Sequence, residues 1–333
     1  MNGGMTGGGA AGGAGGNAVG GAGGGLGAGQ AVEWPGVLSR EEVAGLLRMS
    51  DWRSWGSLAV NWGLVFGSFA LVAAWPNPLT VLAALFVIGA RQLGMAVLMH
   101  EASHRSLLRK RRWNDLVGQW LCAYPIWSDT ILYRPYHLKH HAHTGGPEDP
   151  DLVLTTPFPI TRASLWRKIA RDLSGRPGLK FARAAWQRSF GNWRNAGARR
   201  NAIGFAATNA LLLGGLVWLG HGWLYLLWAG AWFTTNTLVT RIRAIAEHAL
   251  TPNANDPLRN TRTTLARPWE RLLICPNRVN YHLEHHLLMT VPHYRLPAMH
   301  RLLRQRGALH NGCIETGGYL AILRRAASQP AAA

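Results

Sequence analysis

Long apolar stretches dominate the pattern of hydrophobic and polar positions along the chain. Four stretches lack a polar face, at residues 56–75, 79–99, 201–219 and 222–240, and only the second contains a charge, that of Arg91. A helix rises about 1.5 Å per residue, so roughly twenty residues cross the ~30 Å hydrocarbon core of a bilayer. A helix in a soluble protein rarely stays apolar all round over this length. The pattern predicts an all-α membrane protein with four transmembrane helices.

Short connections join the predicted spans in pairs. Pro76, Asn77 and Pro78 separate the first two spans, and Gly220 and His221 separate the last two. Connections this short allow only a tight turn, so we expect two helical hairpins.

Lys and Arg avoid these two connections and flank the spans at their other ends. By the positive-inside rule, both termini and the central segment are predicted to be cytoplasmic. The net charge of +19 is then an orientation signal and an attraction to anionic lipid; no recognisable module suggests nucleic-acid binding. The flanking basic residues are Arg40, Arg48, Arg53, residues 109–112, Arg194, Arg199, Arg200, Arg241 and Arg243.

A shorter apolar stretch, residues 113–127, lies between the second and third predicted spans. It is too short to cross a bilayer comfortably, so we expect an interfacial or re-entrant helix. Arg91, inside the second span, either extends to the interface or lines a polar cavity, and the sequence leaves both possibilities open.

Composition agrees with a membrane protein. Of 333 residues, 48% are hydrophobic and only 15% are charged, against about a quarter in soluble proteins. The three cysteines, Cys122, Cys275 and Cys313, are far apart, which argues against a thiolate metal site or a disulfide framework. Residues 1–32 are almost entirely Gly, Ala and small polar residues, and we predict that they form a disordered tail.

Eight of the 14 histidines fall into three short clusters, with the sequences HEASH at 100–104, HLKHH at 137–141 and HLEHH at 282–286. Helix positions i, i+3 and i+4 share one face, so each cluster can direct its imidazoles at one centre. The predicted topology places all three clusters on the cytoplasmic side. Eight imidazoles exceed the need of one tetrahedral ion, so we predict two metal ions. The candidate ligands are His100, His104, His137, His140, His141, His282, His285 and His286.

These three clusters and the order of the paired spans, over roughly residues 50–310, resemble the membrane fatty acid desaturase and hydroxylase superfamily. The resemblance implies a helical cytoplasmic cap that holds two non-haem iron ions as cofactors. It also implies O2 as co-substrate and electrons from an external donor. It further implies hydrogen abstraction from a substrate held in a narrow tunnel, with a double bond or an alcohol as the product. It places a fatty-acid-desaturase-like domain at residues 33–320, followed by a flexible C-terminal tail at 321–333.

Some members of this superfamily bind iron through one more histidine between the second and third clusters. His248 stands in the matching place and is the predicted ninth ligand. In those members an Asn one turn earlier also serves the site, but this chain has Ala244 there; Asn280 is a candidate substitute. The third cluster begins with His282 and not with Gln, unlike the front-end desaturases.

The expected partners are a membrane lipid or acyl substrate and a separate electron donor, ferredoxin-like or cytochrome-like. The His-Pro-Gly-Gly motif of a fused cytochrome b5 domain does not occur in this sequence, and no nucleic-acid partner is expected. A basic cytoplasmic face would attract an acidic donor.

The remaining histidines receive simpler interpretations. His143 is predicted to lie beside the site or at the surface, and His221 on the opposite side of the membrane. His293, His300 and His310 are expected at the surface or the interface. Five carboxylates near the clusters are candidates to hold the outer nitrogens of metal-bound imidazoles, although none is singled out: Glu101, Asp149, Asp151, Glu247 and Glu284.

The sequence favours an O2-dependent fatty-acyl desaturase and leaves two alternatives. The first is a hydroxylase or ketolase of a lipid, alkane, carotenoid or small substrate on the same scaffold. The second is a non-catalytic membrane haem or metal protein; in such proteins the ligands lie within the spans, whereas here the clusters lie at or beyond span ends.

Overall fold

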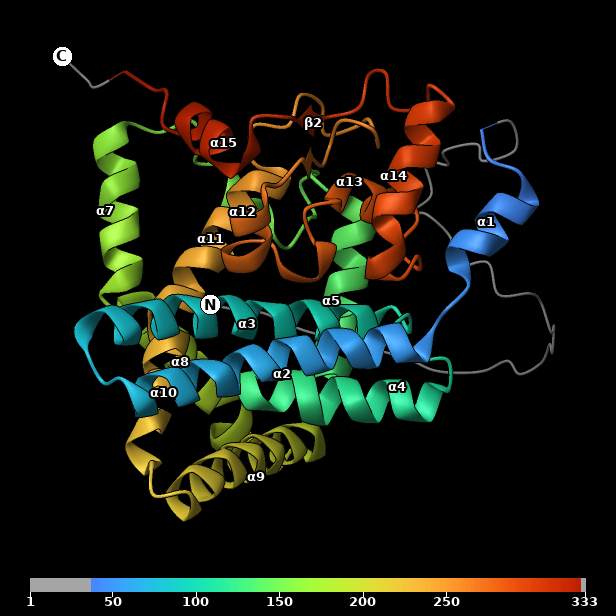
Figure 1. Ribbon diagram of the computed structural model, residues 1–333. Helices are drawn as coiled ribbons and strands as arrows, with labels where there is room; N and C mark the ends of the chain where they lie inside the picture. Colours follow the sequence, from blue (N-terminus) through green and yellow to red (C-terminus); the bar gives the residue numbers. More distant parts are fainter. Residues whose placement is uncertain (1–36, 331–333) are drawn as a thin grey trace, which may run out of the picture.

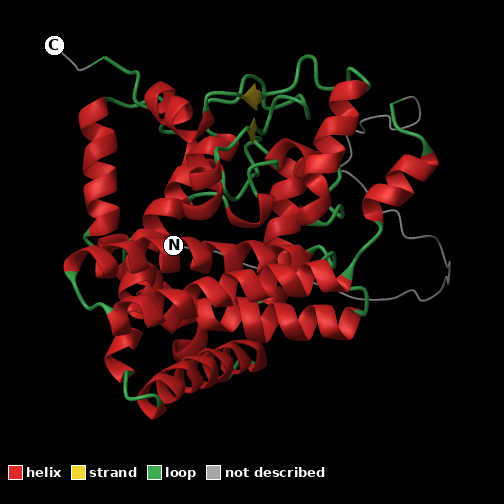
Figure 2. Ribbon diagram, in the orientation of Figure 1, coloured by secondary structure: helices red, strands yellow, loops and turns green. Residues whose placement is uncertain are grey.

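The computed structural model describes residues 37–330, which are mainly helical (Figures 1 and 2). The predicted tail at residues 1–32 lies outside the described residues. The helices, in chain order, are α1 (Arg40–Leu47), α2 (Asp51–Ala74), α3 (Pro78–Ser103), α4 (Arg111–Val117), α5 (Thr130–His143), α6 (Leu152–Thr155), α7 (Arg162–Leu173), α8 (Arg176–Ser189), α9 (Ala196–Trp218), α10 (Tyr225–Phe233), α11 (Thr235–His248), α12 (Pro268–Leu273), α13 (His282–Leu287), α14 (Leu296–Gln305) and α15 (Gly318–Ala326). Two short strands, β1 (Thr263–Thr264) and β2 (Ile314–Glu315), pair in parallel.

Three helices of the described chain are long and apolar enough to cross a membrane, namely α2, α3 and α9. They correspond to the first three predicted spans. Asn77 ends the turn between α2 and α3, where its side chain accepts hydrogen bonds from the backbone N–H groups of Leu79 and Thr80. An N-cap of this kind satisfies donors that the first helical turn leaves free, which is why α3 begins at Pro78.

The fourth predicted span, residues 222–240, is not one continuous helix and is not confirmed. A short 3-10 turn, Gly222–Leu224, precedes α10, and α10 ends at Thr234, whose φ of −119° and ψ of −84° are not helical. Thr234 and Thr235 donate side-chain hydrogen bonds to the backbone carbonyls of Gly230 and Leu85. Threonine hydroxyls compete for helix carbonyls in this way and favour a break. The chain restarts as α11, which carries His248 at its end.

The expected interfacial helix at 113–127 is likewise divided. After α4 the chain forms a π-helical turn, Gly118–Ala123, and a 3-10 turn, Tyr124–Ile126, and it ends at Trp127 with a left-handed φ of 59°. Trp113 and Trp120 are exposed, as suits an interfacial segment.

Helix α3 is the centre of the packing. Its side chains enter three of the hydrophobic clusters, with Leu93, Ile88 and Leu98 as buried representatives. Arg91 is also buried, and its guanidinium donates a hydrogen bond to the carbonyl of Leu272, near the end of the sequence-distant helix α12. Arg91 therefore packs inside the protein, and its place in the wall of a polar cavity stays a prediction.

Residues 321–329, within the predicted C-terminal tail, pack against the rest of the fold. Helix α15 runs through Ala326, and its residues Tyr319, Ile322 and Ala326 are buried in the same cluster as Leu93. The backbone of Ile160 is hydrogen-bonded to Ala326 and Gln329. The apolar face of this amphipathic segment was too short to stand out in the sequence.

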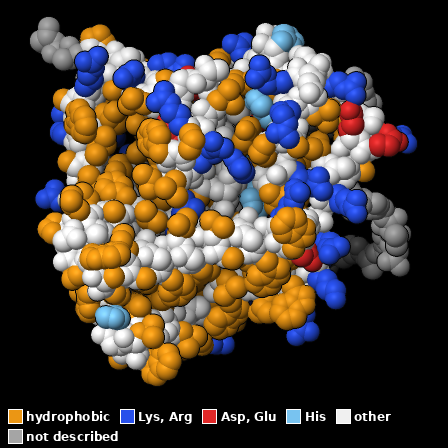
Figure 3. All heavy atoms as spheres, viewed as in Figure 1, with side chains coloured by type: hydrophobic (Ala, Val, Ile, Leu, Met, Phe, Trp, Pro, Cys, Tyr) orange, Lys and Arg blue, Asp and Glu red, His pale blue; other side chains and the backbone are white. Residues whose placement is uncertain are grey.

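In the view of Figure 1, α2, α3 and α4 lie in the lower half with α9 below them, and α11 to α15 lie above. Figure 3 shows hydrophobic side chains over much of the lower half, while Lys and Arg gather over the upper and right parts. Exposed apolar side chains on α2 and α9 include Trp52, Phe66, Leu211 and Trp218. An apolar surface of this extent suits contact with lipid.

Candidate metal centre

Four helices bring the predicted histidines together. The first cluster ends α3, the second lies in the last two turns of α5, the third forms most of α13, and His248 is the last residue of α11. Asp129 caps α5 by accepting hydrogen bonds from the N–H groups of Ile131 and Leu132. This cap fixes where α5 starts and hence which of its faces carries the imidazoles.

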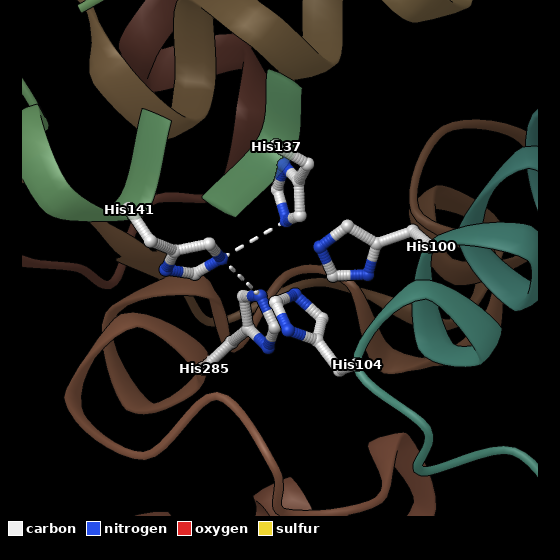
Figure 4. A group of neighbouring side chains, drawn as sticks. All are labelled: His100, His104, His137, His141 and His285. Carbon is white, nitrogen blue, oxygen red and sulfur yellow. Dashed lines mark hydrogen bonds between the residues drawn. The ribbon is translucent and has the colours of Figure 1, made fainter. Parts of the chain in front are cut away.

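The nine predicted ligands form two separate groups. The first contains five imidazoles, and Figure 4 shows their rings converging from α3, α5 and α13. The second contains four imidazoles, from α5, α11 and α13. Within each group the ligand atoms lie within 4.8 Å of one another. The groups are His100, His104, His137, His141 and His285, and His140, His248, His282 and His286.

The ring nitrogens that face inward in each group are mostly Nε2 atoms. In the first group, Nε2 of His141 lies 2.9 Å from Nε2 of His137 and 3.1 Å from Nε2 of His285. In the second group, Nε2 of His282 lies 2.8 Å from Nε2 of His248 and 3.0 Å from Nε2 of His286. Several lone pairs therefore point into one small space, which suits a cation.

Three outer nitrogens are held by neighbouring side chains. Nδ1 of His140 lies 2.7 Å from the carboxylate of Asp149, and Nδ1 of His137 lies 3.1 Å from the hydroxyl of Tyr133. Nδ1 of His286 lies 3.2 Å from Oγ1 of Thr144. An imidazole that donates from Nδ1 keeps the lone pair of Nε2 free for a metal.

Burial favours the neutral form of most of these imidazoles. Desolvation holds the pKa well below its usual range for seven of the nine, all of which lie outside the span-length helices, and the mutual repulsion of neighbouring imidazolium charges acts in the same direction. Nε2 of His100 and both ring nitrogens of His104 are buried and have no hydrogen-bond partner. Neutral, unpartnered imidazoles are good ligands for divalent transition metals, so the residues present fit two iron ions.

Comparison with known proteins agrees with this geometry. The model of the fatty acid desaturase family matches residues 76–314, a segment that includes all nine histidines. The chain belongs to the fatty acid desaturase family.

Relatives of this desaturase-family chain differ in activity. It is 28% identical over 250 residues to the dihydrorhizobitoxine desaturase of Bradyrhizobium elkanii, covering 70% of this chain and 69% of the relative. It is 23% identical over 282 residues to an sn-1 oleoyl-lipid 12-desaturase of Picosynechococcus sp., covering 76% and 77%. It is also 26% identical over 254 residues to a beta-carotene ketolase of a Paracoccus species, covering 73% and 91%. These relatives are oxidoreductases, and they include both desaturases and ketolases.

The five candidate carboxylates of this desaturase-family site take different positions. Asp149 contacts Nδ1 of His140 directly, and Asp151 lies 3.7 Å from the same nitrogen. Glu101 lies 3.8 Å from Nδ1 of His100.

Glu284 and Glu247 lie near other atoms than the Nδ1 nitrogens of His140 and His100. Glu284 contacts no ligand side chain and instead binds Nδ1 of His300 at 2.6 Å, together with the hydroxyl of Thr263. Glu247 lies 3.5 Å from Nε2 of His282, the nitrogen that faces inward.

Two histidines expected at the surface are in fact buried. His293 is 2% exposed, and its Nε2 lies 2.8 Å from Oγ of Ser57, while its backbone N–H donates to Glu101. His300 is 5% exposed against Glu284. Their packing depends on helices distant in sequence, so no local signal distinguished them.

The other residues singled out in the sequence take the following positions. His310 is exposed, and His143 joins neither group and lies 3.8 Å from exposed Glu148. His221 also joins neither group. Asn280 donates its amide to the carbonyl of Thr264, so this side chain holds β1. Tyr133 and Thr144 were missed by sequence reasoning, because hydroxyl residues next to a histidine cluster carry no distinctive pattern.

A cavity of about 310 Å³ reaches the five-histidine group between α3, α5, α8 and α11. His100 and Tyr133 line its inner end, and Leu93, Val97 and Trp232 contribute apolar walls. Its size is at the lower end of the range typical of small-molecule sites. The cavity gives a substrate access to one side of the candidate metal centre.

Proposed function

We propose that this protein is an O2-dependent di-iron oxidoreductase of the membrane that desaturates an acyl chain. One observation carries the proposal: nine imidazoles, most of them buried, converge as groups of five and four beside a cavity that has both apolar and polar side chains in its walls. The three apolar helices and the family membership support a membrane location.

The proposed roles of the side chains follow from their positions. The two imidazole groups would hold the two iron ions, which supply the activation of O2 needed to attack an unactivated C–H bond. Tyr133 and Asp149 orient their histidines, and Leu93, Val97 and Trp232 would hold the substrate beside His100 and exclude water. No side-chain nucleophile takes part.

The overall reaction balances as follows. Two hydrogen atoms leave adjacent carbons of the substrate as the double bond forms, and O2 is reduced to two molecules of water. Two further electrons and two protons are required, and a separate ferredoxin-like or cytochrome-like protein would supply the electrons. The same basic flanks that predict cytoplasmic histidine clusters and termini would attract an acidic donor.

A ketolase or hydroxylase is the second candidate function. It is favoured by the match to the beta-carotene ketolase of Paracoccus, which extends over 91% of that relative. The histidine groups serve both outcomes, since both begin with removal of a hydrogen atom from a C–H bond. The difference lies in whether a second hydrogen atom is removed or an oxygen atom is inserted.

Expression in a bacterial host, followed by mass spectrometry of fatty acids and other lipids, separates these outcomes. A product that has lost two hydrogen atoms and gained no oxygen supports desaturation. A product that has gained an oxygen atom supports the second candidate, as an alcohol when no hydrogen is lost and as a ketone when two hydrogen atoms are lost. A chain with His285→Ala serves as the inactive control. Unchanged lipids in a host that supplies a ferredoxin donor and carotenoids, combined with purified protein that contains no iron, would contradict both.

A further inference from the structure

We propose that the carboxylate of Glu247 is an oxygen ligand of the metal ion in the four-histidine group, so that the two metals have different ligand sets. The inference rests on the proposed di-iron function. It assigns five nitrogen ligands to the first ion and four nitrogens with one oxygen to the second.

The direction from which each carboxylate approaches its imidazole carries the argument. Asp149, Asp151 and Glu101 approach Nδ1 atoms, which are the outer nitrogens of His140 and His100. Glu247 is different, because its Oε2 lies 3.5 Å from Nε2 of His282.

Nε2 of His282 faces the interior of the four-histidine group. Nε2 of His282 also lies 2.8 Å from Nε2 of His248 and 3.0 Å from Nε2 of His286, so it faces the space the ion would occupy. An oxygen beside a ligand nitrogen at this distance occupies the position of a neighbouring ligand and not that of an outer support. Glu247 is outside the set whose ligand atoms all lie within 4.8 Å of one another, so binding requires a small movement of its carboxylate toward the ion.

Arg243 holds the carboxylate in place. Its Nε donates to Oε1 of Glu247 at 2.7 Å, and its Nη2 lies 2.6 Å from Oε2, one helical turn apart on α11. A carboxylate has about four lone-pair positions, so this bidentate pairing leaves positions free for a metal. Arg243 is therefore a positioning residue that restricts Glu247 to one orientation.

The charge of two iron ions and the unequal number of imidazoles in the two groups also favour Glu247 as a ligand. Imidazoles bind metals in their neutral form, so nine of them would leave the charge of two iron ions uncompensated in a largely buried site, where electrostatic interactions are strong. Glu247 is 2% exposed, and as a ligand carboxylate it would contribute a negative charge on the side of the group with one imidazole fewer. Oxygen and nitrogen ligands together suit ferrous iron.

The test compares purified wild-type protein, labelled with ⁵⁷Fe, with Glu247→Gln, which keeps the shape of the side chain and removes its charge. We expect two Mössbauer components in the wild type, and in Glu247→Gln we expect one component to shift or disappear while the other is unchanged. A chelator should remove iron from the altered site at least ~10-fold faster. Glu148→Gln, at an exposed residue, is the matched control and should behave as wild type.

The unchanged component of the five-histidine group reports that the variant is folded. Two unaltered components in Glu247→Gln, with wild-type rates of iron loss, would overturn the assignment of Glu247 and leave the di-iron function intact. Wild-type protein that binds no iron would overturn the proposed function itself.

Discussion

Three imidazoles of the candidate centre have one nitrogen that faces the group and another that contacts a neighbouring side chain. The outer contacts of His137, His140 and His286 come from three different chemical groups, a phenol, a carboxylate and an alcohol. These contacts fix the tautomer and the orientation of each ring. They therefore hold the Nε2 lone pairs in position before a metal binds.

Replacing single ligands should remove different irons. We expect His141→Ala or His285→Ala to deplete the five-histidine ion, and His140→Ala to deplete the other, with activity lost in all three because both ions are required. Iron quantification and Mössbauer spectra check this. His143→Ala, in a residue of neither group, should keep iron and activity; wild-type iron content in all three ligand variants would contradict the assigned centre.

Tyr133→Phe tests the contribution of an outer contact. The ring stays beside His137, with which it stacks at a centroid distance of 5.0 Å, but the hydroxyl near Nδ1 is lost. We expect kcat to fall by about 10-fold or more, and the affinity for iron to weaken in the same direction. Retention of full activity and unchanged iron release would show that the hydroxyl does not support His137.

At the scale of helices, the site depends on close contact between α3 and its neighbours. Gly118, in the π-helical turn, approaches Ala102 in the last turn of α3, and Gly89 approaches Thr235, where α11 begins. A side chain at Gly118 would push that turn away from the end of α3, and one at Gly89 would separate α3 from α11. These glycines therefore act through distance and not through backbone flexibility.

Gly89→Ala should therefore be destabilising. The added Cβ would meet Asn236 N at 2.8 Å and the side chain of Thr235 closer still, which requires α11 to shift. We expect a cost of about 1–3 kcal/mol, measured as a lower thermal midpoint, together with weaker binding of the ion that His248 helps to hold. Gly214→Ala in α9 meets no atom within 4 Å and is the matched control; equal midpoints for the two variants would refute the packing argument.

At the scale of the molecule, the buried neutral histidines make stability depend on pH. Burial lowers the pKa of seven of the nine below the ordinary value of 6.5, and they are His104, His137, His141, His248, His282, His285 and His286. Below 6.5 the unfolded chain therefore binds protons that the folded chain does not. The free energy of unfolding must fall as pH decreases through this range.

Metal-free protein should accordingly have a lower thermal midpoint at about pH 5.5 than at about pH 7.5. Iron should raise the midpoint most at the higher pH, because protons compete with metal for the imidazoles. Thermal unfolding in detergent with and without iron measures both effects. A midpoint of the metal-free protein that rises on acidification would contradict the neutral state of the buried histidines.

Local patterns in the sequence predicted the histidines that the fold brings together and three apolar helices of span length. Spacings of three and four residues in a helix place imidazoles on one face whatever the rest of the fold does, and apolar runs of twenty residues have few other uses. Both signals are local, so His100 to His286 and the helices α2, α3 and α9 were predictable from the sequence.

Tertiary structure alone decided how the ligands divide. His140 and His141 are adjacent in sequence but belong to different groups, because neighbouring helix positions point about 100° apart and α5 passes between the two sets. Contacts between distant segments likewise broke the fourth predicted span at Thr234, buried His293 and His300, and brought Glu247 to the inner side of His282. Such contacts depend on which helices pack together, and no pattern within one helix records them.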